Sequence, residues 1–200
     1  MTFRSLAGTC LLALVSALPV AAHEIVYVTP LTGAAEAPPN ASPATGTARV
    51  TFDLDLVTMR VEATFSDLVG TTTASHIHCC TAVPGTSTAG VATQTPTFVE
   101  FPLGVMAGSY DHTFDMTQAS SYNATFITNN GGTVATAFNA LLAGAAAGSA
   151  YLNIHSSAYP GGEIRGFLQA APIPEPSSVA LMLAGLALAG ALAHKRRRAA

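Results

Sequence analysis

Apolar and polar residues alternate one by one through the middle of the chain. The clearest stretch runs from Ala48 to Phe65, where apolar side chains such as Val50 and Val61 alternate with polar ones such as Thr51. Successive side chains of a strand point to opposite faces, so this period of two predicts strands with one buried and one solvated face. Because the two halves of the stretch lie close in sequence, we expect them to form an antiparallel hairpin.

Shorter segments of the same character predict further strands on both sides of this hairpin. They are Glu24 to Thr29, Thr73 to His78, Thr97 to Phe101, Ser109 to Phe114, Ala150 to His155 and Glu163 to Gln169. The segment Val134 to Leu142 follows helical spacing instead, with Thr133 as a candidate N-cap and Gly144 as a candidate end. We therefore expect an all-β domain over residues 23–170, an antiparallel β-sandwich of the Ig-like or Greek-key type with one short helix.

The first 22 residues are typical of a secretory signal peptide. Arg4 precedes an apolar core from Leu11 to Val20, and small residues at Val20 and Ala22 suit signal peptidase. This pattern predicts export by the Sec machinery and cleavage after Ala22. A lipoprotein signal built on Cys10 does not fit, because the apolar core follows that cysteine instead of preceding it. A retained N-terminal anchor is the alternative.

The other end of the chain holds a Pro-rich linker, an apolar run and a basic tail. The linker covers residues 171–178, and the apolar run of 15 residues from Val179 to Ala193 is at the short limit for a transmembrane helix. The basic tail, residues 194–200, is expected to stay in the cytoplasm and so to place the domain outside. The prominent residues of the linker and the tail are Pro174, Glu175 and Pro176, followed by Arg196, Arg197 and Arg198.

This order of a Pro-Glu-Pro motif, a short apolar helix and an arginine cluster resembles the PEP-CTERM sorting signal of exopolysaccharide-producing Gram-negative bacteria. The resemblance implies that an exosortase, which is a membrane enzyme, cleaves the chain near the motif. An inner-membrane intermediate would then be passed to the cell surface or the extracellular matrix. A plain C-terminal membrane anchor is the alternative interpretation.

Composition narrows the range of partners. Charged residues make up only 10% of the chain, and between residues 23 and 170 three arginines stand against ten acidic residues, a formal net charge of −7. This balance argues against nucleic acid as a partner, because phosphates are bound by basic surfaces. Apart from Cys10 the chain has only Cys79 and Cys80, too few for a scaffold held by several disulfides.

Three histidines on predicted strands form a candidate metal site. His76 and His78 are two residues apart, so their rings share one face about 7 Å apart while Ile77 faces the core. The strand that ends at His155 repeats this order of inward and outward residues. Three imidazoles from neighbouring strands are a ligand set that copper and zinc favour, so a metal site is one interpretation. The interpretation that we favour from the sequence is a structural or recognition role, in which the histidines hydrogen-bond across strands and to the loop at 160–162.

Two further features carry candidate chemistry. Cys79 and Cys80 are adjacent, with Cα atoms about 3.8 Å apart across a trans peptide, so a disulfide between them would form a constrained turn. Metal ligation and intermolecular links are the alternatives. Cleavage after Ala22 would expose the amine and the imidazole of His23, which together chelate copper in some enzymes. No Ser/His/Asp arrangement, carboxylate pair or phosphate loop indicates catalysis, so we predict no catalytic residue.

At the histidine strands the sequence resembles the CHRD domain family, which is named for a module of the animal growth-factor antagonist chordin. The resemblance spans approximately Ile25 to Gln169 and departs from the usual pattern at Cys79-Cys80, where many relatives have a glycine-containing turn. It implies a β-sandwich-like fold but no agreed activity. The matching motifs are Ser75-His76-Ile77-His78, Tyr151-Leu152-Asn153-Ile154-His155-Ser156 and Pro160-Gly161-Gly162-Glu163-Ile164-Arg165-Gly166.

Taken together, the sequence predicts an exported, surface-tethered domain that acts as a non-catalytic binding or structural component of the envelope or extracellular matrix. Its Thr, Ser and Asn content with few charges suits contact with exopolysaccharide or with other envelope proteins. The alternative is a metal-binding exoprotein that uses His76, His78 and His155 to hold copper or zinc. Such a protein could resemble copper–zinc superoxide dismutase, although the further ligands of that enzyme are not recognisable in this sequence.

Overall fold

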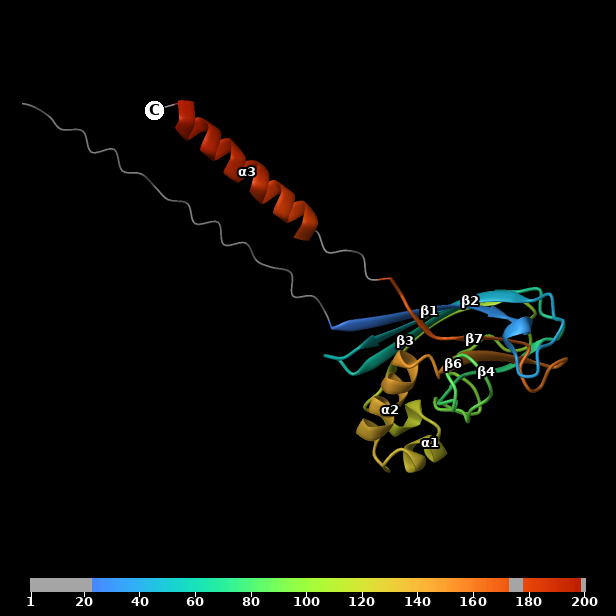
Figure 1. Cartoon of the computed structure of the whole chain (residues 1–200). Helices are drawn as coiled ribbons and strands as arrows, with labels where there is room; N and C mark the ends of the chain where they lie inside the picture. Colours follow the sequence, from blue (N-terminus) through green and yellow to red (C-terminus); the bar gives the residue numbers. More distant parts are fainter. Residues whose placement is uncertain (1–22, 173–177, 199–200) are drawn as a thin grey trace, which may run out of the picture.

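The computed structural model describes residues 23–172 and 178–198 of the chain (Figure 1). The predicted signal peptide and the Pro174-Glu175-Pro176 motif lie outside these residues. The strands are β1 (Glu24–Thr32), β2 (Thr45–Asp53), β3 (Thr58–Ser66), β4 (Thr72–His78), β5 (Gly108–Asp115), β6 (Tyr151–Ser156), β7 (Ile164–Phe167) and β8 (Gln169–Ala170). The helices are α1 (Ala124–Asn129), α2 (Val134–Ala146) and α3 (Ser178–Arg198), with short 3-10 turns η1 (Gly33–Ala35) and η2 (Ala119–Ser121).

The eight described strands form one antiparallel sheet in the order β4-β6-β7-β1-β2-β3-β5, with β8 also paired to β1. Strand β1 pairs with β2 along its whole length, and on its other side it pairs with β7 at Thr32 and with β8 at Tyr27 and Val28. The sheet therefore curves into a half-barrel with β4, β6 and β7 in one wall (Figure 1). The all-β prediction is confirmed, but the predicted two-sheet sandwich is wrong, because β1 joins the two walls.

Strands β2 and β3 form the predicted antiparallel hairpin. Val50 lies opposite Val61 and Phe52 lies opposite Met59, and all four side chains are fully buried. Period-two alternation was thus a correct guide here, because each apolar residue of one strand meets an apolar residue of the next on the same face. The core of the domain lies inside the half-barrel against this face.

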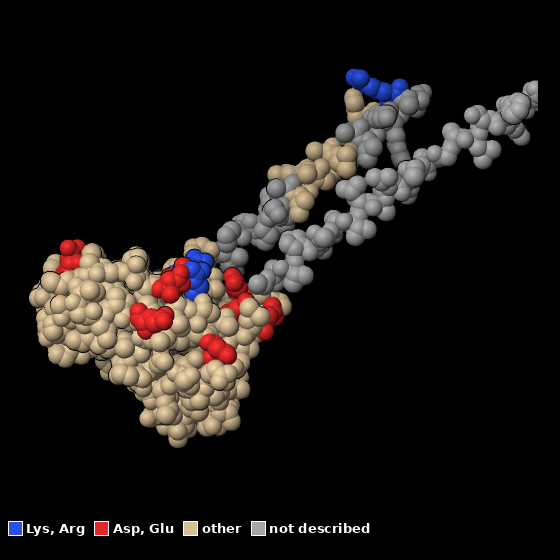
Figure 2. Space-filling model, turned by 180° about the vertical axis from the view of Figure 1, so that it is seen from behind, with Lys and Arg blue, Asp and Glu red and all other residues tan. Residues whose placement is uncertain are grey.

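The outer face of the same strands carries part of the sparse charge of the domain. Arg60 forms a two-point hydrogen bond with Asp111 on β5, and it also lies 3.2 Å from Glu62. Figure 2 shows acidic side chains scattered over this side of the molecule, with basic side chains directly beside some of them. Opposite charges are paired across strands, so the described surface seen there holds no concentrated patch of one sign.

The segment Thr97–Phe101 is not the predicted strand. Pro96 and Pro102 flank it, and a proline cannot donate to a sheet ladder. The segment belongs to a loop that runs along the free edge of β4, where the amide of Phe98 donates to the carbonyl of Ser75 at 3.0 Å. The loop thus protects an edge strand that would otherwise expose its backbone.

Helix α2 begins as predicted, with Thr133 as its N-cap in a capping box. It continues to Ala146, however, so Gly144 lies inside the helix and is not its end. Helix α1 was not predicted from the sequence, and Asn123 caps it by accepting a hydrogen bond from the amide of Thr125. Both helices pack together on one side of the half-barrel (Figure 1), where α2 places Phe138 against the core.

Helix α3 covers the region of the predicted membrane segment, residues 179–193. Within the described residues, no helix reaches the combination of length and apolar character that crossing a membrane requires. The predicted transmembrane helix is therefore not confirmed.

Candidate metal centre

The three predicted histidines meet on one face of the wall formed by β4, β6 and β7. His76 and His78 lie on β4, and β6 brings His155 beside them. The ring centroids of His76 and His155 are 5.2 Å apart, and those of His78 and His155 are 6.0 Å apart. One nitrogen from each ring lies within 4.8 Å of the other two, and the three residues are buried at these atoms. The strand pairing that the sequence did not specify is what brings the third ring into place.

A backbone carbonyl fixes the orientation of each ring. His76 Nε2 lies 2.5 Å from the carbonyl oxygen of Pro96, His78 Nδ1 lies 2.9 Å from that of Ala89, and His155 Nδ1 lies 2.9 Å from that of Pro160. A carbonyl only accepts, so the nitrogen facing it must carry the proton. The remaining nitrogen of each neutral ring is then unprotonated and carries a lone electron pair. The three such atoms are His76 Nδ1, His78 Nε2 and His155 Nε2, and they are buried without a hydrogen-bond partner.

Burial keeps these rings uncharged. It lowers the pKa of His76 and of His155 below the ordinary value, and it lowers the pKa of His78 to about 4. The carbonyl contacts act in the opposite direction, but they do not reverse the shift. At neutral pH the three rings are therefore neutral, which is the form that binds a metal ion.

This arrangement fits a transition-metal ion. Nitrogen ligands about 2.0–2.1 Å from a tetrahedral zinc ion lie roughly 3.3 Å from one another, so a modest closing of the three rings would suffice. Metal-binding histidines commonly donate their other ring N–H to a carbonyl or carboxylate, which holds the ring in place. All three histidines have this second contact. Copper and zinc both favour imidazole nitrogen.

Polar and aromatic side chains extend the same face towards β7. Asn153 on β6 stands between His76 on β4 and Arg165 on β7 in the strand register. The ring of Tyr151 stacks on that of His78, with centroids 4.8 Å apart, and the guanidinium of Arg165 lies 4.7 Å from the centroid of Tyr151. Stacking on one side of the ring and a carbonyl at its Nδ1 leave His78 little freedom to turn.

Arg165 is buried and is paired with Glu36, which follows η1. Its Nε lies 3.7 Å from Glu36 Oε2 and donates to the carbonyl of Ala35 at 2.5 Å. Burial raises the pKa of Glu36 to about 7, against the opposing attraction of Arg165. No property of the sequence had singled out Glu36, because its partner lies far along the chain and only the folded sheet brings the two together.

Glu163 and Arg165 are two residues apart and have opposite charges, yet each has its own partners. Glu163 is fully buried and accepts hydrogen bonds from the hydroxyls of Ser156 and Ser42 and from the amide of Val69. Burial raises the pKa of Glu163, but these hydrogen bonds outweigh burial and the net shift is downward. This carboxylate therefore links the loop at Ser42, the loop at Val69 and the end of β6. None of these hydrogen bonds involves a histidine nitrogen.

The Pro160-Gly161-Gly162 segment shapes the loop beside His155. The amide of Gly162 donates to the carbonyl of Tyr159 at 3.0 Å, which closes a turn around Pro160 and Gly161. The positive φ of 133° is at Gly162 and not at Gly161, so the turn is not of type II, which requires a positive φ at its third residue. The turn aims the carbonyl of Pro160 at His155.

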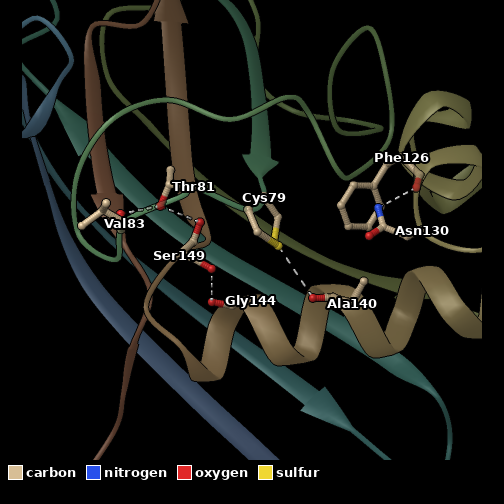
Figure 3. Close-up of a disulfide and its surroundings, with 9 residues drawn as sticks. Cys79, Thr81, Val83, Phe126, Asn130, Ala140, Gly144 and Ser149 are labelled. Atoms are coloured by element: carbon tan, nitrogen blue, oxygen red, sulfur yellow. Dashed lines mark hydrogen bonds between the residues drawn. A yellow bond between two sulfur atoms is a disulfide. The ribbon is translucent and has the colours of Figure 1, made fainter.

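The two cysteines lie next to the centre in sequence but face a different neighbour. Cys79 and Cys80 are joined by a disulfide, with their Cα atoms 3.0 Å apart across a cis peptide bond. Figure 3 shows the bridge above α2, beside Ala140 and Gly144. His23, the other candidate copper ligand, also lies elsewhere: its Nδ1 is 3.2 Å from Asp55. Neither group belongs to the three-histidine cluster.

Two parts of the chain match known families. Residues 172–198 match the PEP-CTERM protein-sorting motif, which defines a class of proteins that an exosortase processes and that Gram-negative bacteria export and sort to the cell surface. Residues 27–168 match the CHRD domain, and the chain belongs to that family. No curated protein and no solved structure matches the chain.

Proposed function

We propose that this protein is an exported cell-surface protein whose CHRD domain binds one copper or zinc ion through His76, His78 and His155. The observation that carries the proposal is the convergence of three histidine rings, with one nitrogen of each within 4.8 Å of the others, while each ring has one nitrogen at a backbone carbonyl and one buried nitrogen without a partner. Buried electron pairs that face one another are unfavourable unless a cation lies between them. Structural histidines would need hydrogen-bond donors at these atoms, and the described residues supply none.

The cellular setting supports this role. The sorting motif directs the protein to the surface, where the domain would act as a non-catalytic metal-binding component of the envelope. Exopolysaccharide and other envelope proteins are the partners that such a location offers. Binding by three neutral imidazoles requires no catalytic residue, so a role in holding or buffering metal is sufficient.

Metal binding is tested on the purified full chain. We expect one equivalent of copper or zinc per chain by elemental analysis, or uptake of one equivalent by calorimetry after treatment with a chelator. The variant His155→Gln should weaken binding by more than about 100-fold, because it removes a ligand and not only a second-sphere contact. The matched control is His112→Gln, since His112 lies on β5 beside Glu100 and outside the cluster. Absence of uptake by the wild-type chain, or equal uptake by both variants, contradicts the proposal.

A further inference from the structure

The histidine cluster offers a metal ion only uncharged ligands. Its three members are imidazoles, and in the described part of the chain no carboxylate or thiolate atom joins their group. Their unpartnered nitrogens are buried, so bulk water does not stabilise an ion between them. Taking an ion out of water costs free energy that rises steeply with its charge, and neutral ligands offset less of this cost than charged ones do. The cluster therefore disfavours ions of higher charge.

A buried cation lies on the same wall of the half-barrel. Arg165 on β7 is 2% exposed, and the guanidinium group stays charged in proteins. Its central carbon lies 4.7 Å from the centroid of the Tyr151 ring, and that centroid lies 4.8 Å from the centroid of the His78 ring. The positive charge is therefore at most roughly 10 Å from His78, a distance at which two charges still interact appreciably inside a protein.

The surroundings of Arg165 fix its position and leave it part of its charge. Its Nη1 donates to the carbonyl of Ser87 at 2.9 Å, and its Nε donates to the carbonyl of Ala35. Glu36 Oε2, 3.7 Å from Nε, opposes the positive charge. Burial raises the pKa of Glu36 to about 7, so its carboxyl group is partly protonated at neutral pH. The Arg165–Glu36 pair therefore presents a net positive charge to the histidine cluster.

We infer that the three-histidine site selects monovalent copper, Cu(I), over divalent zinc and copper, and that the charge of Arg165 strengthens this selection. The inference rests on the proposed function and names the ion that the histidines hold. Repulsion by Arg165 acts on every unit of charge, so it weakens the binding of a divalent ion more than that of Cu(I). Three nitrogens also satisfy Cu(I), whereas zinc takes four ligands. Arg165 does not touch the ion and acts on it through space.

The test measures relative affinities on the full chain. Cu(I) affinity is determined without oxygen against a chromophoric Cu(I) chelator, and Zn(II) affinity is determined against a zinc chelator. We expect Arg165→Met to raise the affinity for Zn(II) about fivefold relative to that for Cu(I), because the repelling charge is gone. The reduction potential of bound copper should fall by about 40 mV, since a tenfold change corresponds to about 59 mV for one electron. Arg165→Lys keeps the charge and is the matched control.

Glu36→Gln provides a change of opposite sign. It removes the carboxyl group that opposes Arg165, so the reduction potential should rise and Zn(II) should bind more weakly relative to Cu(I). A general loosening of the site would instead move Glu36→Gln and Arg165→Met in the same direction. The two substitutions together therefore separate the effect of charge from that of packing.

The outcomes distinguish this inference from the proposed function. If the wild type binds Zn(II) as tightly as Cu(I), or if the two substitutions do not shift the potential in opposite directions, the selection of Cu(I) by charge is overturned and the three-histidine site remains. If the wild type binds neither ion, both proposals are wrong. Should Arg165→Met not fold, the affinities of the wild type and the rise in potential expected for Glu36→Gln still decide between these outcomes.

Discussion

At the scale of single residues, the neutral histidines make the stability of the metal-free domain depend on pH. Burial lowers the pKa of folded His78 to about 4, below its ordinary value of 6.5. As pH falls, the unfolded chain therefore takes up the proton first. Stability is full above about pH 6.5 and is lost progressively towards pH 4. We expect His78 to account for roughly 2–3 kcal/mol of this loss.

The measurement is urea unfolding of the chelator-treated chain at pH 7, 5.5 and 4.5. His78→Phe keeps a ring that stacks on Tyr151 and removes the titrating nitrogen. Its stability should consequently vary less between pH 7 and 4.5 than that of the wild type, whatever its stability at pH 7. An unchanged slope would show that His78 is not held neutral by burial.

Glu163 is a second buried group whose removal has a clear expected effect. Its carboxylate accepts hydrogen bonds from two hydroxyls and from two amides, so a neutral amide in its place would set N–H against donors. We expect Glu163→Gln to cost about 2–3 kcal/mol in unfolding experiments at pH 7. The folded pKa lies below the ordinary value, so this difference should shrink as pH falls through the folded pKa. Glu62→Gln, on the outer face, is the control and should change stability little.

At the scale of elements, the sequence predicted where the strands lie better than it predicted which strands pair with one another. Alternation in β2 and β3 identified which side chains are buried, because a period of two reports the face of a strand. It contains no information on which strand lies alongside, so the single sheet could not be distinguished from a sandwich. The segment 97–101 failed for a related reason, since its Phe98 and Phe101 are buried from a loop and not from a ladder.

The contact between α2 and the disulfide gives a prediction for the helix. Gly→Ala inside a helix ordinarily stabilises by about 0.5–1 kcal/mol. At Gly144 an added Cβ would overlap the sulfur atoms of Cys79 and Cys80. We therefore expect Gly144→Ala to destabilise the oxidised domain by about 1–3 kcal/mol, because neither the helix nor the bridged cysteines can move independently.

Thermal unfolding of the oxidised chain measures this effect. Asn139 lies on the exposed side of the same helix, so Asn139→Ala serves as the control. This control should gain a little stability from helix propensity alone. Equal stabilisation by both substitutions would mean that α2 does not rest on the disulfide. Intact mass under non-reducing conditions confirms in the same samples that the bridge is formed.

At the scale of the whole molecule, the C-terminal motif predicts how the protein is processed. Replacing Arg196, Arg197 and Arg198 together by serine removes the basic cluster at the end of α3 and should prevent exosortase cleavage. We expect the variant to retain its C-terminal tail, which intact mass and cell fractionation would detect. Arg60→Ser on the domain surface is the control and should be processed normally. Cleavage of both variants at the same site would show that the cluster is not recognised.

The sequence predicted only part of the candidate site. The His-x-His spacing and the end of β6 identified the three rings, because a strand places residues two apart on one face. The carbonyls of Ala89 and Pro96 come from a loop misassigned in part as a strand, and Glu36 comes from a turn at the far end of β1. Backbone carbonyls have no residue signature, and Glu36 has no partner near it in sequence. Contacts of this kind become visible only when the fold is known.

The pairing of β8 with β1 determines how the domain is presented at the cell surface. Tyr27 lies beside Ala170, so the chain enters and leaves the domain at the same end of β1, whereas Arg165 lies beside Thr32 at the other end. Those two levels are roughly 17 Å apart along the strand. The strand register sets His76 level with Asn153 and Arg165, so this histidine lies towards the end of the sheet away from the C-terminal exit. Attachment to a solid support through the same tail should leave metal uptake as fast as it is in solution.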